Sequence, residues 1–122
     1  MQTTDLRTYL QARLRSVCER SYYGTAPSDA EFPYQVWNLE AVAYEEGFSL
    51  QELEVDVVDY GTDTAPAEAL ADTLQASLDH HQHLADSFQL SIYRERRQPI
   101  PENDKSVIRR RLTFQVRLHE RS

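Results

Sequence analysis

Three histidines in the stretch DHHQHLAD have residue types suited to binding a metal ion. They are His80, His81 and His83, and two carboxylates, Asp79 and Asp86, flank them. Imidazole and carboxylate groups are both zinc ligands. Adjacent histidines point away from each other on a helix, however, and no Cys or His pair elsewhere completes a tetrahedral set. We therefore expect solvated histidines at the polar end of a helix, and no metal site.

Motifs of enzyme active sites are missing from the sequence. It contains no glycine-rich phosphate-binding loop, no nucleophile elbow and no HExxH motif. Its 3 glycines leave few positions at which backbone N–H groups could surround an anion. A run of about 20 apolar residues, which a membrane span needs, is also missing. The residues thus indicate a soluble, cytoplasmic protein and no catalytic site.

Charge is divided unevenly along the chain. Residues 1–93 carry 4 basic and 16 acidic side chains, whereas residues 94–122 carry 9 basic and 4 acidic ones, and the formal net charge is −7. Such asymmetry can indicate a nucleic-acid site or an interface. The net negative field repels phosphate, and aromatic residues are not interleaved with the basic ones as in RNA-binding sheets. We expect no sequence-specific nucleic-acid binding, which leaves an interface or a merely solvated sheet face.

The spacing of apolar residues predicts the elements that hold these charges. Helical spacing predicts helices over about residues 4–20 and from about Thr64 to His80. Alternation of apolar and polar residues predicts strands within 34–44, 48–61, 87–97 and 108–120. Turn-forming residues predict loops over 22–33 and 98–105 and a turn over 45–47. Four residues of the first strand are expected to share one face: Trp37, Leu39, Ala41 and Ala43.

The fold class follows from this order of elements. Helix, strand, strand, helix, strand, strand predicts an α+β domain with a mostly antiparallel four-stranded sheet in αββαββ order and helices packed on one face. A length of 122 residues with 40% hydrophobic residues suits a single domain, 1–122.

The alternation also assigns side chains to the two faces of the sheet. If Leu112, Phe114 and Val116 face the core, the arginines between and around them face outward. Ile100 lies between two prolines in a loop, where we expect a protruding contact. The candidate interface residues are Glu54, Asp56, Tyr60, Arg94, Ile100, Arg109, Arg111 and Arg117.

Three stretches follow one another as a strand, an acidic strand with a capped helix, and a basic hairpin. They are FPYQVWNLE, GFSLQELEVDVVDYGTDTAPAEALADTL and SFQLSIYRERRQPIPENDKSVIRRRLTFQVRLHE, which cover roughly residues 32–120. This succession resembles the tail-terminator, or tail-completion, proteins of long-tailed bacteriophages and prophages of Gram-positive hosts.

The resemblance implies a structural protein with no enzymatic activity and no cofactor. It implies a six-membered ring that caps the tail tube and joins it to the head connector, assembled in the host bacterial cytoplasm and retained in the virion neck. Partners would be further copies of the chain, the tail tube protein and the head–tail connector. In such a ring we expect the acidic first hairpin to meet the basic second hairpin of a neighbour. The alternative is a small bacterial α+β adaptor or ligand-binding module without a phage function.

Overall fold

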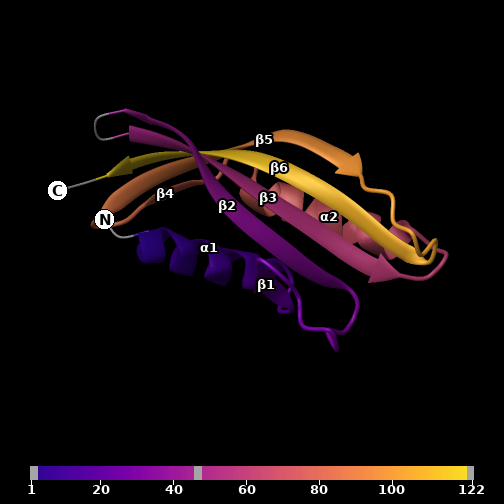
Figure 1. Ribbon diagram of the computed structural model, residues 1–122. Coiled ribbons are helices and arrows are strands. Elements are labelled where there is room, and N and C mark those ends of the chain that lie inside the picture. Colours follow the sequence, from indigo (N-terminus) through magenta and orange to yellow (C-terminus); the bar gives the residue numbers. More distant parts are fainter. Residues whose placement is uncertain (1–2, 46–47, 121–122) are drawn as a thin grey trace.

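The structure is a computed structural model that describes residues 3–45 and 48–120. Within those ranges the elements are, in chain order, α1 (Thr3–Val17), β1 (Ser21–Tyr23), β2 (Tyr34–Glu45), β3 (Phe48–Tyr60), α2 (Ala65–Leu78), β4 (Gln82–Leu84), β5 (Phe88–Pro99) and β6 (Val107–Glu120) (Figure 1). The turn expected over 45–47 falls largely outside the described residues.

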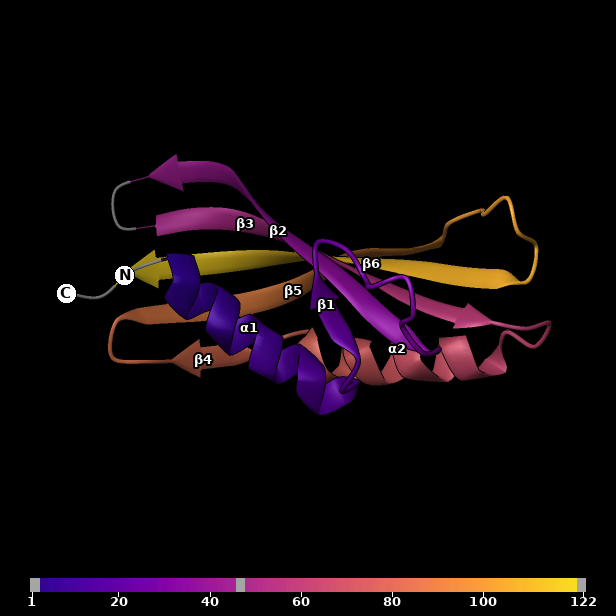
Figure 2. The ribbon, with the colours of Figure 1, turned by 60° about the horizontal axis from the view of Figure 1, so that its bottom comes forward.

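The strands form one curled sheet, a half-barrel, in the order β1-β2-β3-β6-β5-β4. β1 pairs with β2 in parallel, and every other neighbouring pair is antiparallel. The two long hairpins, β2–β3 and β5–β6, therefore join through the central β3–β6 pair. Figure 2 shows the twist of this sheet and the two helices meeting near its middle, where Arg13 donates to the Ser77 carbonyl over 2.8 Å.

The expected four-stranded, mostly antiparallel sheet in αββαββ order is wrong, because the sheet is mixed and has six strands. The missed strands, β1 and β4, form its two edges and contain three residues each. A segment of three residues is too short to show alternation, so its pairing is decided by tertiary contacts.

Buried polar groups at the end of α1 hold β1 in place. The last carbonyls of a helix lack partners within it. Here the Gln35 amide donates to the Leu14 carbonyl at 3.2 Å and to the Ser21 hydroxyl at 2.7 Å, and that hydroxyl donates to the Cys18 carbonyl at 2.6 Å. Strand β1 thus follows directly from the way in which α1 ends.

The core lies between the helices and one face of the sheet. The helices contribute Leu6, Leu10, Leu14, Ala67, Ala71, Leu74 and Leu78. The strands contribute Trp37, Leu53, Val55, Val57, Phe88, Leu90, Ile92, Ile108, Leu112, Phe114, Val116 and Leu118. The alternation predicted for β3, β5 and β6 is thereby confirmed. In β2 only Trp37 and Leu39 reach this cluster, because the strand runs past the core and Ala41 and Ala43 are exposed.

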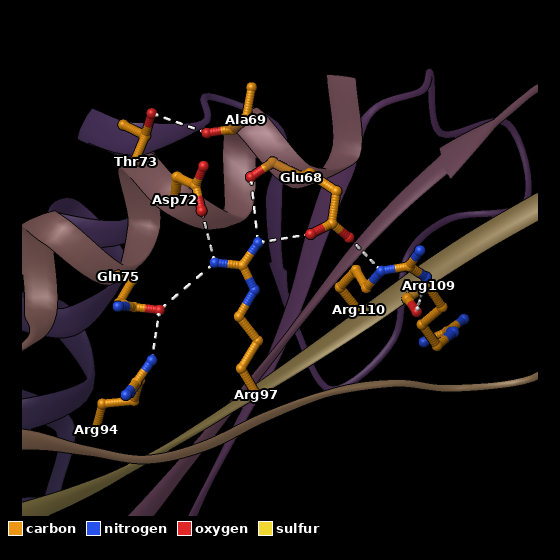
Figure 3. Close-up of polar contacts among 9 residues, drawn as sticks. All are labelled: Glu68, Ala69, Asp72, Thr73, Gln75, Arg94, Arg97, Arg109 and Arg110. Atoms are coloured by element: carbon orange, nitrogen blue, oxygen red, sulfur yellow. Dashed lines mark hydrogen bonds and ion pairs between the residues drawn. The ribbon is translucent and has the colours of Figure 1, made fainter. Parts of the chain in front are cut away.

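Charged side chains continue the inner face where the apolar residues end (Figure 3). Arg97 of β5 donates to Glu68 at 2.8 Å and to Asp72 at 2.7 Å, both on α2. Arg110 of β6 donates to the other oxygen of Glu68. A bulge between Arg94 and the residue at 96 shifts the alternation of β5, so that position 97 faces the helix. These contacts, the α2 clasp, fix the helix to two strands at once.

Glu68 is the centre of the α2 clasp, and its ionisation is coupled to these bonds. The hydrogen bond from Arg110 lowers the pKa of the Glu68 carboxyl against the effect of burial, and the bond from Arg97 lowers it further. A depressed carboxyl pKa stabilises the folded state above the unfolded value, and this contribution is lost as the pH falls through the folded value.

Replacing Glu68 with Ala is expected to lower the free energy of unfolding at pH 7 by about 1 kcal/mol, since the lost bonds are charged but partly exposed. The difference from wild type should shrink below about pH 4.5, where the carboxyl is protonated in the unfolded chain. Urea denaturation of wild type and variant at pH 7 and below about pH 4.5 measures this difference in the free energy of unfolding. Glu95→Ala, an exposed carboxylate of the same sheet, is the control, and equal losses in the two variants would contradict the α2 clasp.

Candidate functional site

The outer face of the sheet, turned away from the helices, gathers most of the predicted interface residues. Register places Asp56 of β3 directly opposite Arg111 of β6, and Glu54 opposite Thr113. The outward-facing positions of β6 are Arg109, Arg111, Thr113, Gln115, Arg117 and His119. The predicted assignment of Glu54, Asp56 and these arginines to one face is therefore confirmed by the register.

Asp56 is the centre of a charge network on this face. It is 5% exposed and accepts hydrogen bonds from Arg109 Nη1 at 2.8 Å and from Arg111 Nε and Nη2 at 2.8 and 3.0 Å. Arg111 also lies 3.3 Å from Glu54, and Arg109 bonds Glu102 at 2.6 Å. The bond to Asp56 raises the pKa of Arg111, so this guanidinium stays charged. Two cations and three carboxylates thus pair with one another within one protomer, and one negative charge is left over.

This network makes the expected contact between hairpins of neighbouring protomers less favourable. The acidic positions of β3 and the basic positions of β6 already meet inside the chain, because β3 and β6 are neighbours. A contact between copies through Asp56 and Arg111 would have to break bonds that the protomer already makes. Their interface role stays a prediction.

The other four candidates lie apart from the network. Tyr60 ends β3, is 55% exposed and packs its ring 5.6 Å from that of Phe32. Arg94 faces α2 and donates to Gln75 at 3.0 Å. Ile100 is half-buried and lines a hollow of about 450 Å³, so it does not protrude. Arg117 lies exposed on the outer face, 5.9 Å from the Tyr93 ring.

Replacing Asp56 with Ala is expected to lower the free energy of unfolding by about 2–3 kcal/mol, because two half-buried guanidinium groups lose their shared acceptor. Glu52→Ala on the same strand is the control, expected to change stability by no more than about 0.5 kcal/mol because Glu52 forms no ion pair with any described residue. Chemical denaturation of both variants measures the difference. Similar values for the two would show that the network adds nothing.

The sequence predicted solvated histidines at the polar end of a helix. In the structure, not all of the histidines lie there in solvent. Helix α2 ends at Leu78, and His80, with φ of 62°, turns the chain into β4. The His83 ring stacks on Tyr9 of α1 at 4.0 Å, and His81 Nε2 lies 2.5 Å from the Tyr9 hydroxyl. Among residues 3–45 and 48–120, no group of three His, Cys, Asp or Glu side chains is placed to hold a metal ion. These rings join α1 to the β4 edge.

His81 makes this contact sensitive to pH. Burial lowers the pKa of His81, and the charges of Arg13 and His83 lower it further. Burial raises the pKa of Tyr9, so its hydroxyl stays a donor at neutral pH. Only an unprotonated Nε2 can accept this proton. Because the unfolded chain binds the His81 proton more readily, stability falls as the pH drops through the ordinary histidine range.

Between about pH 7.5 and pH 5.5, His81→Gln is expected to lose less stability than wild type, because it lacks the group that the unfolded state protonates. Thermal unfolding at both pH values measures this. His80→Gln, whose side chain is 78% exposed in the native protein, should keep the wild-type pH dependence. An unchanged pH dependence in His81→Gln would contradict this account of the ring contact.

The fold defined by these elements is a curled six-stranded mixed sheet with two helices on one face, and it occurs in a solved virion structure. No protein-family model matches the sequence, and no curated protein matches it significantly. A chain of the structure titled "Virion of native gene transfer agent (GTA) particle" superposes with a TM-score of 0.70 at 17% sequence identity. The match covers 91% of this chain and 90% of that chain. At this identity the likeness establishes the fold.

The described helices also bear on the expected lack of a membrane span. Neither α1 nor α2 combines the length and the apolar character needed to cross a bilayer.

Proposed function

We propose that this chain is a structural virion protein of the tail-terminator type, which closes the end of a tail tube as a ring and joins it to the head connector. The observation that carries this proposal is the likeness to a virion chain over nine-tenths of both chains. Because so little of either chain is left over, that virion component is built on essentially this domain alone. The proposal gives the chain a structural role and no enzymatic one.

The terminator role is the finer part of the proposal, and the resemblance of residues 32–120 to that family supports it. A protein that ends a tube must contact different partners on different sides, since one surface meets its own copies and others meet the tube and the connector. The chain offers distinct surfaces for this: a polar outer sheet face, an exposed hairpin end at residues 40–44, and the loop at 100–106. Assembly would occur in the host bacterial cytoplasm.

Deleting the gene from a bacterium that produces the particles is expected to give tails of irregular, increased length that fail to join heads, because nothing stops polymerisation of the tube. Electron microscopy of purified particles measures tail length and head attachment, and expression of the wild-type chain in trans is the control. Mass spectrometry of the wild-type particles tests the coarser claim separately. Tails of normal length on joined heads would rule out the terminator role, and absence of the chain from particles would rule out a virion protein.

A further inference from the structure

A groove of about 590 Å³ lies between α1 and β1. Its lining includes Arg7, Gln11, Ala12, Arg15, Tyr23 and Trp37. The Trp37 indole N–H donates to the Gln11 side chain at 2.6 Å, and the Tyr23 ring packs edge-on against it at 4.8 Å. Because Trp37 is only 1% exposed, the accessible aromatic surface of the groove is the Tyr23 ring, which is 40% exposed.

Two arginines give this α1–β1 groove a positive rim. Arg7 lies 3.8 Å over the Tyr23 ring, and Arg15 stands eight residues further along α1, about 12 Å away along the helix axis. Both are exposed, and neither forms an ion pair with a described residue. They differ in this from Arg97, Arg109, Arg110 and Arg111, which are all paired within the chain. An acidic segment with apolar side chains would complement this groove.

The distal hairpin, residues 40–44 and 48–52, has that character. Val42 and Tyr44 are 62% and 69% exposed, so the end of β2 presents apolar surface that no described residue covers. Glu40 lies directly opposite Glu52 across the β2–β3 ladder, and neither carboxylate has a described cationic partner. Like charges opposite each other in a sheet are destabilising, so a cation brought by a partner would relieve this repulsion.

The occupant of the groove is a second copy of the chain. Figure 1 shows the end of the β2–β3 hairpin lying apart from α1 and β1, so the hairpin is placed to reach a neighbour's groove and not its own. We propose that the distal hairpin of one copy docks in the α1–β1 groove of the next, with Glu40 and Glu52 facing Arg7 and Arg15. Val42, at the register shift of β2, covers the exposed Tyr23 ring, whereas Tyr44 pairs with Ser49 and lies on the hairpin face opposite to the two glutamates. Because the two patches differ, the contact is head to tail and can close into a ring.

This inference deepens the proposed function by naming the contact that builds the ring, and it replaces an outer-face contact through Asp56 and Arg111. Those residues are neutralised within the protomer, whereas the charges of the hairpin end and of the groove are not. Exposed ion pairs contribute only about 0–1 kcal/mol each, so apolar contacts between the hairpin and the exposed Tyr23 ring must supply most of the affinity.

Charge reversal tests the contribution of each of the two patches separately. The groove variant is Arg7→Glu with Arg15→Glu, and the hairpin variant is Glu40→Lys with Glu52→Lys. Sedimentation of the purified chains up to near-millimolar concentration measures association. Each variant alone is expected to associate about tenfold more weakly than wild type or worse. A variant with all four reversals should regain association. Arg96→Glu with Lys105→Glu, which reverses two other exposed cations, is the control and should associate as wild type does.

Mixing the two variants gives the sharpest outcome. Each carries one native and one reversed patch, so both contacts between unlike copies are complementary, and the mixture should associate as wild type does although neither variant does so alone. Wild-type association by either variant alone, a mixture that associates no better than the separate variants, or a wild-type chain that stays monomeric throughout would overturn the proposal.

The result is independent of the proposed function. If the groove variant still caps tails at the wild-type level, the docking proposal fails while the terminator role stands. If the variants associate as expected but the chain is absent from particles, the docking proposal stands and the virion role fails.

Discussion

Strand alternation divides three consecutive arginines of β6 between the two faces of the sheet, and much of the structure depends on that division. Arg110 points inward and joins Arg97 on Glu68, which fixes α2 to β5 and β6. Arg109 and Arg111 point outward and converge on Asp56, which ties β6 to β3. One short run of sequence thus fastens a helix on one side and the central strand pair on the other. A shift of register by one residue would exchange both sets of partners.

The division also accounts for the uneven charge of the chain. The basic C-terminal part and the acidic N-terminal part look like two complementary surfaces when they are read along the sequence. In the folded chain they meet at the β3–β6 pair and between α2 and the sheet. Many of these opposite charges therefore pair within the protomer and stabilise it. What remains for partners is a smaller set of charges, which includes those on the exposed side of α1 and at the end of the β2–β3 hairpin.

The sequence was sufficient to predict the long helices and strands, but it was insufficient to predict the contacts between them. Apolar spacing located both helices, the four long strands and the inward residues of β3, β5 and β6, because each repeat is long enough to define a face. It also placed Asp56 and Arg111 on the same outer face. Their pairing depended on β3 and β6 being neighbours, which neither hairpin specifies. Arg97 was missed because the bulge in β5 reverses its face, and β1 and β4 were missed because three residues show no period.

The short edge strands leave part of a long strand open. β1 covers β2 only at Gln35–Trp37, and no described strand pairs with that side of β2 beyond this point. An uncovered strand edge can recruit another chain through its backbone and begin aggregation. Here the register shift between Ala41 and Ala43 interrupts the ladder, and the Glu40 carboxylate adds a charge at the edge. These two features disfavour the addition of a further strand to the open edge of β2, so this edge is a poor template for aggregation between copies.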